Sequence, residues 1–298
     1  NGFDDIIFGT DSDNLYVLLD DLTIAPNFPV TLPDKIQSEP AIYDTGNEKI
    51  ILTGCKDNLL HAINYSDATS RFTIVTGDDV FTSPSFNENN IYFGSDDGYV
   101  YAVDLNGNSL EGFPIDVGSA VVGSVVFSDL NGNGSYDMVV ATSSGDIFAF
   151  DNMGQSLQYF PISYQFQMSS SPLVVDIDLD GDLEIIAGTA GDLFAVDLKI
   201  SSSPDNDYWA MYKGNLQRTG YFQSSGDGGF DDCSEPLLGD VTCDSIINIL
   251  DIVNLVNMVI DGFDNFTDYQ LWSADITQDG IINILDIVTT VNIVMSED

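Results

Sequence analysis

Two C-terminal segments carry oxygen-bearing side chains at regular intervals. DVTCDSIINILDIVNLVNMV begins at Asp240 and DITQDGIINILDIVTTVNIV at Asp275, and the two agree at 14 of 20 positions. Each has the ligand spacing of a calcium loop that runs into a helix, with side-chain oxygens at positions 1, 3, 5, 9 and 12 and a backbone carbonyl at position 7. The predicted calcium ligands are Asp240, Thr242, Asp244, Ile246, Asn248 and Asp251 in the first loop, and Asp275, Thr277, Asp279, Ile281, Asn283 and Asp286 in the second.

Two earlier loops show a shorter version of the same spacing. They have side-chain oxygens at positions 1, 3, 5 and 9, a carbonyl at position 7, and a glycine for the tight turn at position 6. The predicted ligands are Asp129, Asn131, Asn133, Ser135 and Asp137 in one loop, and Asp176, Asp178, Asp180, Asp182 and Glu184 in the other. The alternative is a hydrophilic turn without metal. The spacing and its repetition favour structural calcium.

The elements around these loops recur every 40 to 47 residues. Each repeat contains a strand-like run that ends in Asp or Asn, and the five runs are LYVLLD, LLHAIN, YVYAVD, DIFAFD and DLFAVD. Another strand-like run precedes each of them, and Glu39-Pro40, Ser83-Pro84 and Ser171-Pro172 open three repeats. Short strands at this period predict an all-β propeller of about five four-stranded repeats. The first repeat is expected to be incomplete, because Asn1 falls inside a blade.

The repeats resemble the FG-GAP and pyrroloquinoline-quinone-like propeller families. The resemblance covers residues 1–222 and implies structural calcium between strands. The resemblance does not imply a bound quinone. The quinone sites of that family contain cationic and metal-binding groups that we cannot place in this sequence. The segment Trp209–Tyr221 looks like the closing stretch of secreted propellers.

The C-terminal segment, residues 238–298, resembles a type I dockerin. That resemblance implies a small all-α module with two calcium ions that binds a cohesin-like domain. One helix is expected after each loop, with no clear entering helix. Ser245 replaces the usual turn glycine of the first loop, and threonine at position 3 is a poor ligand, so both sites are expected to be weak.

The domain organisation follows from these two patterns. We predict a propeller at 1–222, with repeats near 1–38, 39–82, 83–123, 124–170 and 171–222. A linker is predicted at 223–237, where glycine, serine and aspartate gather. The dockerin-like module follows at 238–298.

The composition narrows the choice of partners. The chain has 48 acidic residues against seven basic ones, a net charge of −41. This charge excludes nucleic acid and anionic membranes as partners, because phosphate binding needs a cationic surface. No apolar run reaches the length of about 18 residues that a membrane span needs. We expect a mature, soluble, extracellular chain, secreted or attached to a bacterial surface, in a saline and divalent-rich medium that screens self-repulsion.

Little in the sequence could perform chemistry. We expect the single histidine, His61, to be a hydrogen-bonded strand residue and Cys55 to be a buried free thiol. Cys233 and Cys243 could form one disulfide. No catalytic or cofactor-binding residue is predicted, although a glycosidase-type carboxylate pair is not excluded.

The helices after the C-terminal loops are apolar over more than one face. The interval from Ile249 to Ile260 has polar side chains only at Asp251, Asn254 and Asn257. This pattern favours a partner surface over a purely internal core. Since the two repeats are nearly identical, they could present the same face in two orientations.

Three functional hypotheses follow. The first is a non-catalytic calcium-binding propeller attached through its dockerin to a cohesin. The second is an extracellular fibre subunit in which the propeller and dockerin of successive copies make head-to-tail contacts. The third is a polysaccharide-active enzyme delivered by its dockerin. The fibre hypothesis predicts that the strand at Ile6–Gly9 receives an added strand, either from residues 216–222 or from a second chain.

Overall fold

The computed structural model describes residues 5–177, 182–201, 209–214, 218–223, 237–242, 247, 249–261, 268–277 and 281–296. Contacts divide the chain into two compact units, Asn1–Gly226 and Asp227–Asp298. Among the described residues, no helix is long and apolar enough to cross a membrane.

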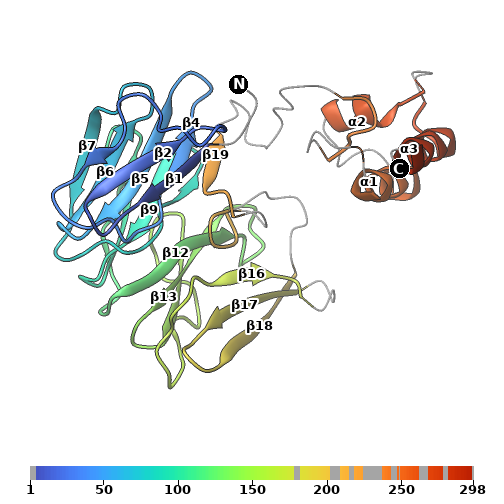
Figure 1. The fold of residues 1–298 in the computed structure, drawn as a ribbon. Helices are drawn as coiled ribbons and strands as arrows, with labels where there is room; N and C mark the ends of the chain where they lie inside the picture. Colours follow the sequence, from blue (N-terminus) through green and yellow to red (C-terminus); the bar gives the residue numbers. More distant parts are fainter. Residues whose placement is uncertain are drawn as a thin grey trace. The chain divides into compact units, whose positions relative to one another are not determined.

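The first unit consists of five β-sheets that follow one another along the chain (Figure 1). Sheet 1 contains β1 (Ile6–Gly9), β2 (Asn14–Leu18) and β3 (Val30–Thr31). Sheet 2 contains β4 (Ala41–Asp44), β5 (Lys49–Cys55), β6 (Leu59–Asn64) and β7 (Ser70–Val75). Sheet 3 contains β8 (Ser85–Asn87), β9 (Asn90–Gly94), β10 (Tyr99–Asp104) and β11 (Ile115–Asp116). Sheet 4 contains β12 (Val121–Ser128), β13 (Asp137–Thr142), β14 (Asp146–Asp151) and β15 (Ile162–Ser163). Sheet 5 contains β16 (Leu173–Val175), β17 (Asp182–Gly188) and β18 (Leu193–Ser201).

Within these sheets, consecutive strands pair antiparallel, as expected for a propeller-like repeat protein. Sheets 2, 3 and 4 have the four consecutive strands that the repeat pattern predicts. Sheet 1 has three strands in the described residues. Sheet 5 also has three strands in the described residues, and residues 202–208 of the predicted fifth repeat lie outside them. β12 begins at Val121, ahead of the repeat boundary predicted at 123/124.

Apolar side chains hold successive sheets together. Strand alternation puts Leu15 and Val17 on one face of β2, where they pack with Ile51 and Ile63 of sheet 2. A larger cluster joins sheets 2, 3 and 4 through side chains such as Tyr92. A further cluster joins sheets 4 and 5. Burying one large aliphatic or aromatic side chain contributes about 1.5–3 kcal/mol, so these stacked faces supply most of the cohesion of the unit.

The segment after β18 returns across the first strands of several sheets. The Trp209 carbonyl accepts a hydrogen bond from Phe127 N of β12 (2.9 Å), and the Ala210 carbonyl accepts one from Val174 N of β16 (3.0 Å). β19 (Tyr221–Gln223) then pairs parallel with β4 and becomes a fifth strand of sheet 2. The predicted closing stretch therefore forms backbone hydrogen bonds with the first strands of sheets 2, 4 and 5.

The prediction that residues 216–222 add a strand to β1 is wrong within the described residues, whereas the alternative, a strand from a second chain, stays a prediction. β1 pairs with β2, from Ile6↔Leu18 to Gly9↔Leu15, and no other described strand joins it. The strand that residues 221–223 provide goes to β4 instead. The reason is side-chain packing, because Phe222 stacks on Tyr43 of β4 with ring centroids 5.2 Å apart.

The described residues of the second unit form three helices, α1 (Ile249–Asp261), α2 (Asp268–Ala274) and α3 (Ile284–Ser296). Its small core consists of Val241, Leu255, Met258 and Ala274, with Ile282 and Ile287 packed against it. α2 ends immediately before Asp275, so the second loop does have an entering helix. The expectation of no such helix is therefore wrong for this loop.

Candidate metal sites

The loop between β12 and β13 is organised around two buried carboxylates, Asp129 and Asp137. Asp129 accepts hydrogen bonds from Asn133 N (3.0 Å) and Gly134 N (2.8 Å). Asp137 accepts one from Leu130 N (2.9 Å). Backbone amides thus turn both carboxylates into the same loop, which is the arrangement that a hard cation requires.

The Asn131 side chain joins these two carboxylates, whereas the Asn133 side chain forms a hydrogen bond within its own turn. The Asn131 side-chain amide lies 3.0 Å from both Asp137 oxygens. Asn133 Oδ1 instead accepts a hydrogen bond from Ser135 N (2.7 Å). Positions 1, 3 and 9 of the predicted cage are therefore brought together, and position 5 forms an Asx turn.

Electrostatics at this loop favour a bound cation. Burial, together with the nearby carboxylates of Asp129 and Asp151, raises the pKa of Asp137 to about 6, although the hydrogen bond from Leu130 N lowers it in part. Neither Asp129 nor Asp137 forms an ion pair with a Lys or Arg in the described part of the chain. Two buried carboxylates without a basic partner fit a divalent ion, which would offset both charges.

The second short loop, between β16 and β17, has one hydrogen bond in common with the first. Ile177 N donates to Glu184 Oε2 (2.8 Å), as Leu130 N does to Asp137. Glu184 is buried and pairs with Val175 across the hairpin, as Asp137 pairs with Ser128. Asp176 directly follows β16, while Asp182 lies 3.9 Å from the Lys199 ammonium. The predicted ligands Asp178 and Asp180 lie outside the described residues.

The two C-terminal loops share one hydrogen-bond pattern. The completely buried carboxylate at position 12 accepts bonds from the backbone and the hydroxyl of the threonine at position 3. These distances are 2.8 and 2.8 Å for Thr242 to Asp251, and 3.1 and 2.9 Å for Thr277 to Asp286. The threonine hydroxyls, predicted as ligands, thus act here as donors that position the carboxylates.

The remaining predicted positions divide into three groups. Asp240 is buried and lies 3.3 Å from the Thr242 hydroxyl, so positions 1, 3 and 12 of the first loop converge. In the second loop, Asn283 caps α3 through Leu285 N (2.9 Å), and its side chain donates to the Ile281 carbonyl (2.7 Å). Asp275 follows α2 at the start of this loop. Asp244, Ile246, Asn248 and Asp279, like Cys233 and Cys243, lie outside the described residues.

Sequence reasoning missed a cavity of about 700 Å³ in the first unit. Equivalent positions at the starts of four sheets line it, namely Glu39, Ser83, Gly123 and Ser171. Met211, Tyr212 and Arg218 from the closing segment line it as well. The Glu-Pro and Ser-Pro pairs were visible in the sequence, but only the stacking of the sheets brings them around one space.

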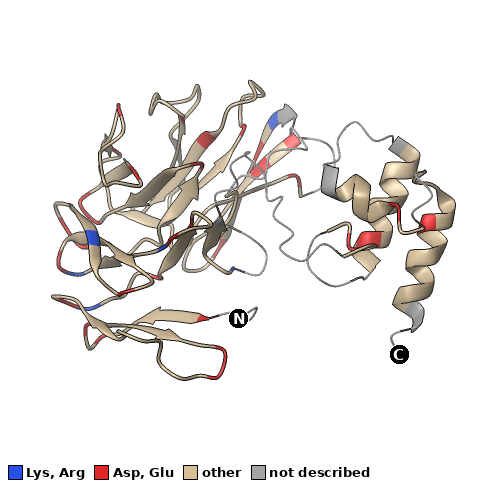
Figure 2. Cartoon of the chain, turned by 90° about the horizontal axis from the view of Figure 1, so that it is seen from above, with Lys and Arg blue, Asp and Glu red and all other residues tan. Residues whose placement is uncertain are grey.

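Acidic residues are spread over both units, whereas basic ones are few (Figure 2). With seven Lys and Arg for 48 carboxylates, most acidic groups cannot have a basic partner. Ion pairing within the chain therefore cannot balance the charge, and cations from solution must do so.

Comparison with known proteins supports the repeat assignment. Residues 129–187 match the FG-GAP-like repeat family, and this stretch contains both short loops. No curated protein matches the chain. Solved structures with similar folds include the computationally designed Ika8 protein, U3-55K and BamB from Moraxella catarrhalis. Their identities are 17%, 13% and 13%, and their TM-scores are 0.49, 0.48 and 0.49.

These likenesses are partial. They cover 66%, 66% and 65% of this chain and 56%, 58% and 59% of the three proteins, respectively. The chain thus spans less than two thirds of each protein's length. The assignment as a propeller-like repeat protein rests on the order of the sheets and on the family match.

Proposed function

We propose that this chain is a non-catalytic, calcium-binding interaction protein. Its propeller-like unit is the displayed body, and its C-terminal unit is a dockerin-type module that binds a cohesin-like domain. We place the protein outside a bacterial cell, secreted or attached to the surface. The abundance of calcium there and the net charge of −41 support this location.

The observation that carries the proposal is a pair of matching apolar surfaces on α1 and α3. In α1, Ile249, Leu250 and Val253 are 68%, 56% and 50% exposed. The same repeat positions in α3, Ile284, Leu285 and Val288, are 67%, 58% and 51% exposed. Exposed aliphatic groups in such a small unit favour a partner surface, because leaving them in water is unfavourable.

The duplication of this surface has a consequence for binding. The two helices present the same residue types at the same exposure, so a partner that fits one helix also fits the other. Asp251 and Asp286 lie within these helices and are completely buried. Calcium bound by these carboxylates would couple each loop to the orientation of its helix.

The proposal is tested by binding to a panel of purified cohesin domains in calcium. Leu250→Glu and Leu285→Glu place a charge on one surface each, and the double variant affects both. Each single variant should keep binding within a few-fold of the parent, whereas the double variant should lose it. Val75→Glu, at an exposed valine of β7, is the matched control and should bind like the parent. Binding by no cohesin, or undiminished binding by the double variant, would argue against the module assignment.

A fibre subunit is the second candidate, and one observation favours it. The outward face of sheet 1 exposes Ile6 and Phe8, and sheet 5 exposes Leu193. In such a fibre, the propeller-like unit of one copy contacts the C-terminal unit of the next, and this contact would cover exposed apolar side chains of the propeller. Sedimentation and negative-stain images of the pure chain in calcium distinguish the candidates, because only the fibre predicts filaments without a partner. Assays on a polysaccharide panel test the non-catalytic assignment.

A further inference from the structure

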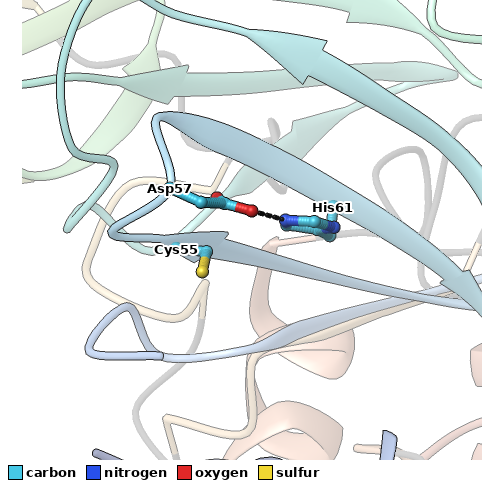
Figure 3. Close-up of side chains that lie close together, drawn as sticks. All are labelled: Cys55, Asp57 and His61. Atoms are coloured by element: carbon cyan, nitrogen blue, oxygen red, sulfur yellow. Dashed lines mark hydrogen bonds and ion pairs between the residues drawn. The ribbon is translucent and has the colours of Figure 1, made fainter. Parts of the chain in front are cut away.

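A cluster of three potential metal ligands lies in sheet 2 (Figure 3). Cys55 ends β5, Asp57 lies in the following turn, and His61 lies in β6. One potential ligand atom from each residue lies within 4.8 Å of the others. Together they offer a sulfur, an oxygen and a nitrogen, whereas the calcium loops offer only oxygens.

The cluster is buried and internally connected. His61 Nε2 lies 2.9 Å from Asp57 Oδ2, and Cys55 Sγ donates to the Asp34 carbonyl at 3.1 Å. The side chains of His61 and Asp57 are 8% and 10% exposed, and Cys55 is a free thiol with no exposure. These contacts agree with the expectations of a hydrogen-bonded His61 and a buried Cys55.

Sheet 3 provides an internal comparison, because the same three positions there are Ser95, Asp97 and Tyr101. Tyr101 Oη donates to Asp97 Oδ2 (2.6 Å), as His61 contacts Asp57. Ser95 Oγ donates to the Asp79 carbonyl (3.1 Å), as Cys55 does to that of Asp34. Two hydroxyl groups therefore satisfy the structural hydrogen bonds of this hairpin. Sheet 2 replaces both of them with groups that ligate transition metals.

We propose that Cys55, Asp57 and His61 form a binding site for a transition-metal ion of the Zn²⁺ class. Zinc binds thiolate, imidazole and carboxylate at about 2.0–2.3 Å, which places tetrahedral ligand atoms about 3.3–3.7 Å apart. The three atoms lie within 4.8 Å of one another, so metal binding would draw them closer through side-chain rotation. The Asp34 carbonyl is a further oxygen near Sγ.

The charges in this site also balance. On binding, the Cys55 thiol loses its proton to solvent, so a thiolate and a carboxylate neutralise one divalent ion in a buried position. The metal would replace the contact between His61 and Asp57 with three bonds that join β5, the turn and β6. Soft sulfur and imidazole ligands select against calcium, so the two metals occupy different parts of the chain.

The test uses Co²⁺ as a spectroscopic substitute for Zn²⁺, in excess calcium so that the oxygen-ligand loops are filled. The full chain carries Cys233→Ser and Cys243→Ser, which makes Cys55 the single thiol. We expect a thiolate-to-cobalt charge-transfer band in the near ultraviolet that saturates at one equivalent. Added Zn²⁺ should abolish this band and raise the thermal midpoint of the first unit.

A matched variant separates metal binding from the structural hydrogen bonds. Cys55→Ser with His61→Tyr reproduces the sheet 3 arrangement, so it should retain the fold and the calcium response. It should lose the cobalt band and the zinc-dependent thermal shift. Absence of the band in the single-thiol chain would overturn the proposal whatever the variant does. A zinc shift that persists in the variant would overturn it as well.

Discussion

The Lys49 ammonium lies 3.3 Å from Asp44 Oδ2 at the hairpin of sheet 2. Ile50 of β5 pairs with Tyr43 and with Asn64, as Asp137 of β13 pairs with Ser128 and with Asp151. Glu184 holds this position in sheet 5. Sheet 2 thus has the apolar Ile50 where sheets 4 and 5 have a carboxylate. Its Asp44, which follows Tyr43 as Asp129 follows Ser128, is paired with Lys49. Its hairpin carries its own cation, whereas the other two hairpins are expected to take theirs from solution.

The first prediction is that these hairpins respond differently to calcium. Asp137→Asn should reduce the calcium-dependent rise in the thermal midpoint of the first unit, leaving only the contribution of the loop before Glu184. Lys49→Met should destabilise that unit by about 1 kcal/mol equally with and without calcium, because the lysine is half exposed and screened by solvent. Tryptophan fluorescence in a Trp272→Phe background reports on this unit alone, since the chain has two tryptophans. A full calcium response in Asp137→Asn would contradict the site.

The second prediction concerns pH. The folded-state pKa of Asp137, about 6, exceeds the unfolded value of about 3.9. Without metal, protonated Asp137 therefore stabilises the folded first unit below pH 4. This contribution, on the order of 2–3 kcal/mol, is lost as the pH rises through 6. Since calcium needs the ionised carboxylate, its stabilising effect should grow over the same interval.

Urea unfolding at pH 5 and pH 7.5 measures both effects. Asp137→Asn cannot ionise at this position, so the difference between parent and variant isolates Asp137 from the other carboxylates. If the free energies of unfolding of the metal-free parent and variant change by the same amount between the two pH values, Asp137 does not titrate with a raised pKa.

The third prediction is that the C-terminal unit depends on calcium for folding. Its core is small, so metal binding energy supplies much of its stability. Chelation should remove amide-exchange protection in α1 and α3 while the first unit stays folded. Asp251→Ala and Asp286→Ala should each weaken calcium binding most at their own loop. Asp67→Ala, at an exposed turn of the first unit, is the control. Unchanged exchange in excess chelator would refute the metal loops.

The fourth prediction concerns the closing segment. Trp209 is 4% exposed, and its ring meets Phe86 edge-on at 5.4 Å. Trp209→Ala should therefore destabilise the first unit by about 3–5 kcal/mol, through the cavity it leaves and the lost ring contacts. Urea unfolding followed by circular dichroism measures this change. Trp209→Phe, which keeps an aromatic ring, should cost much less. Equal effects of the two variants would show that the ring does not hold the segment in place.

Several features could be predicted from the sequence because local rules govern them. A strand needs alternating or continuous apolar residues, and a calcium loop needs oxygens at fixed intervals, so repeats such as YVYAVD and the loop from Asp129 to Asp137 were recognisable. The structure places Asp129 and Asp137 close together because the loop is short. The family match over residues 129–187 falls on this same stretch.

The features that the sequence did not reveal depend on contacts between distant residues. The choice of β4 as the partner of β19 follows from Phe222 meeting Tyr43, and no local pattern encodes that packing. The cavity forms only when Glu39, Ser83 and Ser171 are brought together by stacked sheets. Cys55 and His61 looked like two unrelated strand residues until the β5–β6 register placed both beside Asp57.

The sequence alone determined the repeating strands and the calcium-type loops, because each depends on neighbouring residues. The tertiary structure decided which edges pair and which side chains meet, because packing free energy accumulates only between segments far apart in the chain.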